Sequence, residues 1–201
     1  MRPCHPSWSA ARRTGAGSSS GPGPRRFLFI VVAMPLRLRP FISDDEAAVL
    51  EAQRELSADG FMFALGYEDG MDWQDYLDSL EHERLGLDLA ADRVPGSMLA
   101  AEISGVLVGR LSVRHALNEF LAREGGHLGF AVRPQHRRNG YATEIVRQGL
   151  IVARSLGVDR ALVTCDEDNI GSATVIERCG GVFDSIHLTD EDRPMRRYWI
   201  D

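Results

Sequence analysis

Residues 127–165 contain the pattern that most constrains the fold of this chain. An apolar run at residues 127–132 is followed by Pro134 and a polar, basic turn. Residues 141–156 then carry apolar side chains at helical spacing, and residues 161–165 form a second apolar run. A strand, a helix and another strand in this order predict a right-handed crossover between two parallel strands.

The chain on either side of this unit also alternates between strand and helix patterns. Ser43 with Glu46 three residues later predicts a capping box, and Asp72 is placed to cap a second helix. Ser104-Gly105 between two apolar runs indicates a hairpin. The remaining predicted elements are strands at 36–39, 98–103, 106–113, 182–186 and 195–200, a helix at 170–179, and a short helix or loop at 115–124. The order β-α-α-β-β-β-α-β-α-β-β predicts an α/β (α+β) domain with a mixed sheet.

Residues 1–33 differ in composition from the rest of the chain. Residues 14–24 are rich in Gly, Ser and Pro, which predicts disorder. A basic pair and the apolar residues 27–33 resemble a signal peptide, but the apolar part is short and no clear cleavage site follows. We therefore expect a disordered leader or non-native upstream extension at 1–33 and one domain at 34–201.

The charge distribution excludes several classes of partner. The chain contains no lysine, and residues 1–33 carry five arginines and no acid, which leaves 18 arginines, 29 acidic residues and a formal charge of −11 for the rest. An acidic domain does not predict nucleic-acid binding, and no apolar run approaches the roughly 20 residues that span a bilayer. The three cysteines are widely spaced, which predicts no metal or disulfide framework and favours a reducing cytoplasm.

The turn before residue 141 has the chemistry of a phosphate site. The first N–H groups of a helix have no intrahelical partner, and the helix dipole adds about half a positive charge there. Gly140 lets a ligand approach the backbone because it has no Cβ atom. A P-loop needs lysine and a dinucleotide fingerprint needs a Gly-x-Gly-x-x-Gly run after a strand, and the chain has neither.

The segment from Arg137 to Ala142 matches the pattern Arg/Gln-x-x-Gly-x-Gly/Ala. With this motif the sequence resembles the GNAT superfamily of acyl-CoA-dependent N-acetyltransferases over residues 36–201, most strongly over 114–181. The resemblance implies a central mixed sheet with a splayed parallel strand pair, flanked by helices. It also implies acetyl-CoA as co-substrate and no metal. Further similar segments, which match a subgroup of predicted bacterial acetyltransferases, are Arg114-His115-x-Leu117-Asn118, Gly126–Phe130, Thr164–Asn169 and Arg197–Ile200.

The resemblance also implies how acetyl-CoA is held. Its pyrophosphate would lie on backbone N–H groups at the start of the helix, and its pantetheine arm would pair with the preceding strand as an added strand does. The residues implied are Phe130, Ala131, Val132, Arg137, Arg138, Asn139, Gly140, Tyr141, Ala142, Thr143, Asn169 and Ser172. Simpler roles stay open, with the strand residues as core and Asn169 as a helix N-cap.

The implied reaction is direct attack of a neutral amine on the acetyl thioester. His127 is the first candidate for the base, because its ordinary pKa of about 6.5 suits proton transfer at neutral pH; a half-buried histidine bonded to backbone is the alternative. Many relatives carry the acid, a tyrosine, seven residues after the asparagine, but Ile176 occupies that position here. Tyr198 is the candidate replacement, and Cys179 is another, although core packing also explains a cysteine there.

The acceptor is left open between a small-molecule and a peptide amine. Phe61, Trp73 and Tyr76 belong to the region that shapes the acceptor pocket in such folds, but core packing explains them equally well. His115 and Glu119 are weaker candidates for the base. The missing tyrosine leaves a non-catalytic acyl-CoA-binding or regulatory module as the alternative function, with transfer of another acyl group as a third. Exposed strand edges allow a homodimer.

Overall fold

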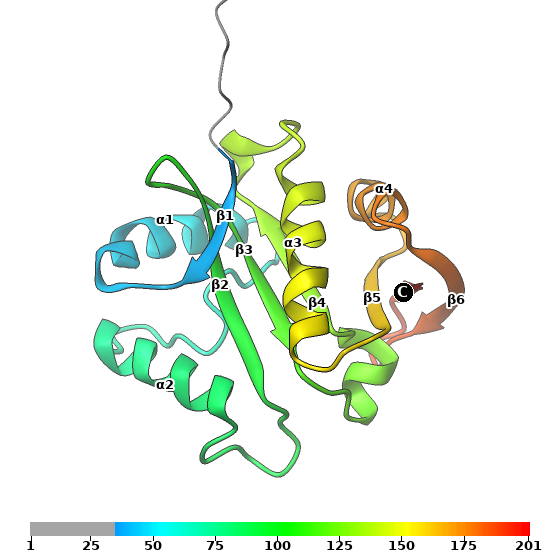
Figure 1. The fold of residues 1–201 in the computed structure, drawn as a ribbon, viewed down its shortest axis with the longest axis horizontal. Coiled ribbons are helices and arrows are strands. Elements are labelled where there is room, and N and C mark those ends of the chain that lie inside the picture. Colours follow the sequence, from blue (N-terminus) through cyan, green and yellow to red (C-terminus); the bar gives the residue numbers. More distant parts are fainter. Residues whose placement is uncertain (1–34) are drawn as a thin grey trace, which may run out of the picture. The chain divides into compact units, whose positions relative to one another are not determined.

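The structure is a computed structural model that describes residues 35–201. These residues form a seven-stranded sheet with helices packed against it (Figure 1). The strands are β1 (Arg37–Pro40), β2 (Gly96–Ile103), β3 (Val106–Arg114), β4 (Leu128–Val132), β5 (Ala161–Asp166), β6 (Val182–Leu188) and β7 (Pro194–Ile200). The helices are α1 (Glu46–Ser57), α2 (Trp73–Leu85), α3 (Tyr141–Ser155) and α4 (Ile170–Arg178). The predicted leader at 1–33 lies outside the described residues.

The sheet has the strand order β1-β2-β3-β4-β5-β7-β6. All neighbouring strands are antiparallel except β4 and β5, which α3 connects. The α/β fold, the mixed sheet and the parallel crossover are therefore confirmed. Within the described part of the chain, β4 and β5 pair at one position, Leu128 opposite Val163, and the two strands diverge beyond it.

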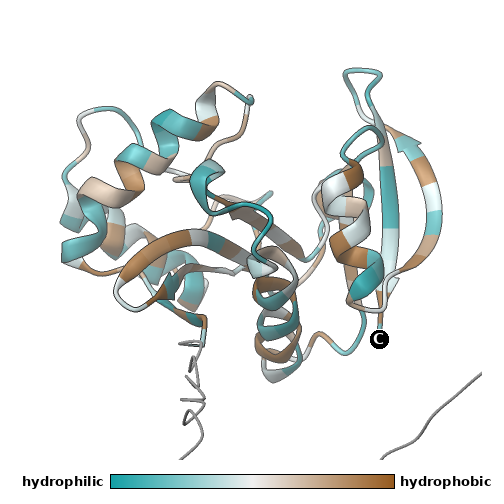
Figure 2. Cartoon of the chain, turned by 90° about the horizontal axis from the view of Figure 1, so that it is seen from above, coloured by the Kyte–Doolittle hydropathy of each residue, from teal (hydrophilic) through white to brown (hydrophobic). Residues whose placement is uncertain are grey.

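Two apolar clusters lie on opposite faces of the sheet. On one face, α1 and α2 bury Val49 and Tyr76 against Ala131 of β4. On the other face, α3 and α4 bury Ile145 and Ile176 in a second cluster. Figure 2 shows apolar and polar residues alternating along the helices, as expected where one side of each helix is buried. The sheet is thus covered on both faces.

Local capping follows the sequence at one helix and departs from it at another. Asp72 caps α2 as predicted, because its Oδ1 accepts from two backbone N–H groups of the first turn at 2.8 and 3.3 Å. The capping box at Ser43 is wrong, because α1 begins at Glu46 and Ser43 caps no N–H group. Asp45 organises this turn instead and accepts from the Ile42 N–H at 2.9 Å. The helical turn therefore starts one residue earlier than predicted, with Ile42 and Asp45 at the spacing predicted for Ser43 and Glu46.

The segment predicted as a short helix or loop contains one wide helical turn, η2 (Leu121–Gly125). Asn118 starts this turn, since its Oδ1 accepts from the Leu121 N–H at 2.8 Å. Gly126, with φ of 61°, redirects the chain into β4. No helix within residues 35–201 is long and apolar enough to cross a membrane.

Candidate functional site

The turn between β4 and α3 begins at Arg133, whose side chain is held by two ion pairs. The Arg133 side chain is 6% exposed and donates to Glu51 at 2.6 Å and to Glu55 at 2.7 and 3.0 Å. Its hydrogen bond holds the pKa of the Glu55 carboxyl below its ordinary value. Both glutamates lie on α1, so this cluster fixes the end of β4 to that helix.

Two left-handed residues shape the turn itself. Arg138 has φ of 67° and Gly140 has φ of 80°. A Cβ atom at Gly140 would meet no protein atom within 4 Å, so the backbone conformation favours glycine and the space beside it is open. Asn139 closes the turn, because its Nδ2 donates to the His136 and Arg137 carbonyls, each at 3.1 Å.

The start of α3 presents a row of unpaired backbone donors. Within residues 35–201, the N–H groups of residues 138–143 have no hydrogen-bond partner, and no side chain caps the helix. The first bond of α3 runs from the Glu144 N–H to the Gly140 carbonyl at 3.3 Å. Unpaired N–H groups at the positive end of a helix dipole attract an anion. The geometry that the predicted phosphate cradle requires is therefore present.

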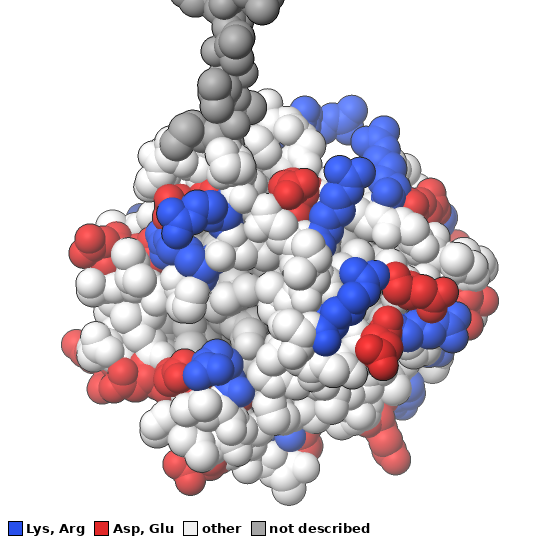
Figure 3. Space-filling model, viewed as in Figure 1, with Lys and Arg blue, Asp and Glu red and all other residues white. Residues whose placement is uncertain are grey.

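Basic side chains gather around the end at which α3 begins (Figure 3). Arg137 and Arg138 are both exposed. Arg137, predicted to lie beside the phosphates, donates from Nη2 to Asp59 at 2.9 Å and from Nε to the Val132 carbonyl at 3.3 Å. The Arg137 side chain is thus directed toward α1 and the end of β4.

The backbone of β4 presents free groups toward β5 at alternate residues. Two bonds to β3, one donated by the Arg133 N–H and one accepted by the His127 carbonyl, set the alternation. Because alternate residues of a strand point their backbone groups to opposite neighbours, Phe130 and Val132 point theirs toward β5. Ala131 has its backbone toward β3 and its side chain in the core, 8% exposed. Of the three predicted strand residues, Phe130 and Val132 therefore direct backbone groups between the strands, although the Val132 carbonyl already accepts from Arg137.

The predicted residues on α4 form its first turn and its buried side. Asn169 is the N-cap, since its Oδ1 accepts from the Ser172 N–H at 3.0 Å. Ile176 is fully buried in the core. Just beyond α4, the Cys179 Sγ lies 3.6 Å from the Thr143 carbonyl oxygen, which links this helix to the start of α3. A contact of Asn169 or Ser172 with CoA stays a prediction.

His127, the predicted base, ties the two splayed strands together. Its backbone N–H donates to the Leu162 carbonyl at 2.7 Å, and its Nδ1 accepts from the Leu162 N–H at 2.9 Å. The side chain is buried, and burial together with the nearby charge of Arg114 lowers its pKa. The contact uses the basic ring nitrogen and leaves the proton on Nε2. These contacts are those of a histidine bonded to backbone, and the base role stays a prediction.

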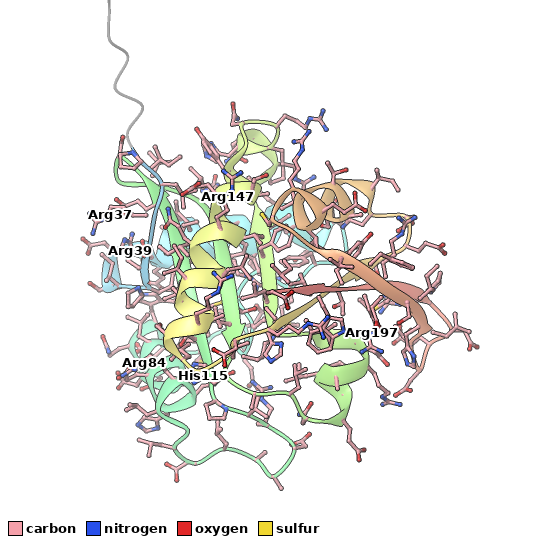
Figure 4. The ribbon with its side chains drawn as sticks, turned by 45° about the vertical axis from the view of Figure 1, so that its right-hand side comes forward. Arg37, Arg39, Arg84, His115, Arg147 and Arg197 are labelled. Atoms are coloured by element: carbon pink, nitrogen blue, oxygen red, sulfur yellow. The ribbon has the colours of Figure 1, made fainter. Side chains whose placement is uncertain are left out.

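The two weaker candidates for the base lie beyond the end of β3. His115 Nε2 is 2.9 Å from the Ser97 Oγ. Burial and the charge of Arg84, which lies close by in Figure 4, lower the pKa of His115. Glu119 is exposed and lines a cavity described below.

Tyr198, the predicted acid, is buried beside α4. Its side chain is 1% exposed, and its hydroxyl donates to the Glu177 Oε1 at 3.2 Å. Burial raises the pKa of this phenol, so it keeps its proton at neutral pH. Cys165 is also buried, and burial raises the pKa of its thiol to about 11. Tyr198 is therefore in the protonated form that a donor needs.

A cavity of about 770 Å³ opens beside α2, the second half of β3 and η2. Ser112 and Arg114 of β3 line it. Trp73 and Tyr76, considered for an acceptor pocket, are instead 6% and 0% exposed in the core. The sequence pattern assigned no role to Arg110 or Arg114, although two arginines four residues apart in an apolar strand lie on the same face of that strand, which is a signal that points to them. Among residues 35–201, no group of three or more His, Cys, Asp or Glu side chains is placed to hold a metal.

Comparisons with known proteins agree with this geometry. A family described as an acetyltransferase (GNAT) domain matches residues 35–182. A structure described as a probable acetyltransferase has a TM-score of 0.62 at 16% identity, covering 83% of this chain and 92% of that chain. Mycobacterium smegmatis RimJ in complex with CoA-disulfide has a TM-score of 0.60 at 19% identity, with coverages of 82% and 81%.

The microcin C7 self-immunity acetyltransferase MccE, in complex with acetyl-CoA and AMP, has a TM-score of 0.58 at 13% identity, with coverages of 83% and 92%. No curated protein matches the chain significantly. At these identities the solved structures show a shared fold, while the family match spans most of the chain. The chain therefore belongs to the GNAT acetyltransferase family and is an acetyltransferase.

Proposed function

We propose that this acetyltransferase moves an acetyl group from acetyl-CoA to a primary amine by direct attack of the amine on the thioester. One observation carries the proposal: the unpaired N–H groups of residues 138–143 adjoin the unpaired edge of β4. The first feature suits a pyrophosphate, and the second suits the amides of a pantetheine arm. The CoA-disulfide in the RimJ structure and the acetyl-CoA in the MccE structure support a CoA ligand for this fold.

Each part of acetyl-CoA has a proposed partner in this chain. The pyrophosphate is bound by the backbone of residues 138–143, with Gly140 keeping the approach open. The pantetheine amides pair with the backbone of Phe130 and Val132. Asn169 and Ser172, at the start of α4 just after β5, contact the CoA arm from the side of β5.

The chemistry needs a neutral amine and two proton transfers. The amine nitrogen attacks the thioester carbonyl carbon, the C–S bond breaks, and the nitrogen gives up a proton. A backbone N–H of β4 stabilises the oxyanion of the tetrahedral intermediate. The Nδ1 of His127 takes the amine proton when the Leu162 N–H releases this nitrogen, or a water next to His127 takes it, and Tyr198 supplies a proton to the leaving thiolate. General acid–base catalysis of this kind contributes about 10²–10⁴-fold to the rate.

Thiol release with a panel of primary amines tests the proposal. The protein is first shown to bind acetyl-CoA by calorimetry, and free thiol is then followed with each amine. Amine-dependent thiol release, with the acetylated amine detected by mass spectrometry, is the expected result. Binding of acetyl-CoA without thiol release from any amine would favour the non-catalytic module. Preference for a longer acyl-CoA in competition would favour transfer of another acyl group.

Two further proposals concern the setting of the enzyme. The wide spacing of the cysteines is the basis for proposing a cytoplasmic location. Because β1 and β6 are the edge strands of the sheet, a homodimer through an edge is also proposed. Light scattering of the full chain measures the oligomeric state, and cell fractionation measures the location.

A further inference from the structure

A buried guanidinium without a carboxylate partner lies beside the cavity. Arg110 is 2% exposed and sits in the middle of β3. Its Nη2 donates to the Met62 carbonyl at 3.0 Å, and its Nη1 donates to the Ser112 Oγ at 3.1 Å and to the Gly129 carbonyl at 3.4 Å. Its Nε has no hydrogen-bond partner within residues 35–201. Met62 and Ser112 both line the cavity, so this charge lies directly behind the cavity wall.

Arg114 brings a second positive charge to the same place. It lines the cavity, and its Nη1 donates to the Gly125 carbonyl at 3.4 Å. A Cβ atom at Gly129 would lie 3.0 Å from the Arg114 Nη1 and 3.7 Å from the Arg110 Nη1. The two guanidinium groups therefore meet over Gly129 of β4, one residue before Phe130.

Neither guanidinium is in contact with a carboxylate of the protein, and Arg110 instead lies over the Phe61 ring, 4.8 Å from its centroid. Among the described residues, no carboxylate lies within 4.0 Å of Arg110 or Arg114, whereas the similarly buried Arg133 has two glutamates. Glu83 is an acidic residue of the cavity wall near Arg114, but it pairs with Arg93 at 3.3 Å. A buried charge without a counter-ion is costly, and its usual partner is an anion. Burial, with the charge of Arg114 adding to it, lowers the pKa of Arg110 to about 9.

We infer that the cavity binds an acceptor that carries an anionic group close to its amine, with Arg114 as the partner of that group and Arg110 adding its positive charge from behind the cavity wall. The inference rests on the proposed function, because it names the substrate class for the same reaction. A carboxylate and a phosphate share the chemistry that two guanidinium groups recognise. The cavity volume of about 770 Å³ is that of a small-molecule site.

The position over Gly129 connects this anion site to the reaction. Phe130, the next residue, presents its backbone to the splayed side of β4, where the thioester is proposed to lie. An anion bound over Gly129 would hold an amine a few bonds away near that edge. Besides Glu83, the cavity has two acidic residues, Asp92 and Glu119. Both are exposed, and they are placed to attract the cationic end of the same molecule.

Acceptor pairs that differ in one charge test the inference. Each α-amino acid is compared with its amide, and an aminoalkyl phosphate with its amino alcohol, at saturating acetyl-CoA. The expected result is a kcat/KM at least about 10-fold higher for the anionic member of one pair type, as charge-assisted hydrogen bonds would give. The two pair types distinguish a carboxylate from a phosphate. Thermal shifts with the same probes measure binding independently of turnover.

Variants of the arginines separate recognition from folding. Arg114→Gln is expected to lower kcat/KM for the anionic acceptors about 10–100-fold and to change it little for their neutral partners. Arg114→Lys should recover part of the loss. Arg123→Gln is the matched control, because Arg123 lines the same cavity but is exposed and pairs with Asp190 at 3.5 Å. Arg110→Gln is assayed if its melting temperature shows that it folds, and Arg114→Gln decides the test by itself.

The outcomes separate this inference from the proposed function. Transfer to amines with equal or opposite preference within the pairs overturns the inference and leaves the proposed function standing. If no amine is acetylated but the anionic probes give a thermal shift, and Arg114→Gln removes that shift, the proposed function is overturned and the anion site is supported. Absence of a thermal shift with every anionic probe, or equal losses for both members of a pair in Arg114→Gln, overturns the inference.

Discussion

The Nδ1 of His127 accepts a hydrogen bond from the backbone N–H of Leu162 at 2.9 Å. The same two residues are joined by a second bond, from the His127 N–H to the Leu162 carbonyl at 2.7 Å. Together these contacts close the end of the parallel pair, next to the single bridge between β4 and β5. The splayed strands are therefore held at one end by a side chain and are open at the other end for a ligand.

The buried imidazole predicts a dependence of stability on pH. Burial and Arg114 lower the pKa of His127, so below about pH 6.5 the unfolded chain binds more protons than the folded one. The free energy of unfolding should fall as pH decreases from about 6.5 to the folded-state pKa, by at most about 1.4 kcal/mol per unit for this group. Urea unfolding at several pH values measures this slope.

His127→Asn offers an acceptor to Leu162 without a titrating group, so it should flatten the slope. His115, whose pKa is also lowered, contributes in the same direction. His115→Gln therefore serves as the control that removes only the share of His115. An unchanged slope in His127→Asn would contradict the assignment of the pH dependence to His127.

The proposed base role of His127 predicts a loss of turnover. His127→Ala should lower kcat by about 10²-fold if the imidazole takes the amine proton, and the pH profile of kcat/KM should lose its acidic limb. Thiol release measured from about pH 5 to pH 9 checks this, because the lowered pKa of His127 places the acidic limb below about pH 6.5. Near-full turnover of His127→Ala across this range would remove the base assignment and leave the hydrogen bond to Leu162 as the role of the side chain.

Gly140 predicts a selective loss of acetyl-CoA binding. A tryptophan at this position would fill the open space beside the N–H groups of residues 138–143, so Gly140→Trp should weaken acetyl-CoA binding by more than about 10-fold. Calorimetric titration measures the dissociation constant. Gly157→Trp is the matched control: Gly157 follows the other end of α3, with φ of 87° and no atom within 4 Å of an added Cβ.

Both glycine variants should lose about 1–2 kcal/mol of stability, because both force a side chain into the left-handed region. Only Gly140→Trp should lose acetyl-CoA. If Gly140→Trp binds acetyl-CoA as tightly as the wild type, the turn is not the pyrophosphate site.

Replacing Arg133 by glutamine is expected to lower the stability of the protein strongly. Arg133→Gln leaves Glu51 and Glu55 without their partner and opens the base of the turn, which should lower the free energy of unfolding by about 2–3 kcal/mol. Arg137→Gln breaks the exposed pair with Asp59 and should cost less than about 1 kcal/mol. Chemical denaturation of the two variants side by side checks the contrast, and equal losses would contradict it.

Replacing Tyr198 by phenylalanine is expected to lower kcat without unfolding the protein. Tyr198→Phe retains the edge contact with Phe183, whose ring centroid is 5.7 Å away, and removes the proposed proton donor. A drop in kcat of about 10²-fold with unchanged acetyl-CoA affinity is expected. Glu177→Gln, which alters the acceptor of the Tyr198 hydroxyl, should have a smaller effect. Unchanged kcat in Tyr198→Phe would mean that the thiolate leaves without help from this residue.

The sequence predicted the elements whose signals are local. The β4–α3–β5 crossover, the Ser104-Gly105 hairpin and the Asp72 cap depend on spacing and on residues within one turn of each other. The capping box at Ser43 failed because the helical turn starts one residue earlier, where Asp45 accepts from the Ile42 N–H. Local rules recognise the residue types of a cap, but they do not fix which of several neighbouring residues starts the helix.

The site residues also fall into those that the sequence indicated and those that only the tertiary structure brought together. The motif from Arg137 to Ala142 by itself indicated an anion site at a helix start, because unpaired N–H groups and a helix dipole arise from the backbone of consecutive residues. Only the tertiary structure decided that His127 bonds to Leu162 and that Arg110 and Arg114 meet over Gly129. These contacts join strands that are distant in the sequence, and the register between the strands sets them, which no pattern within one segment encodes.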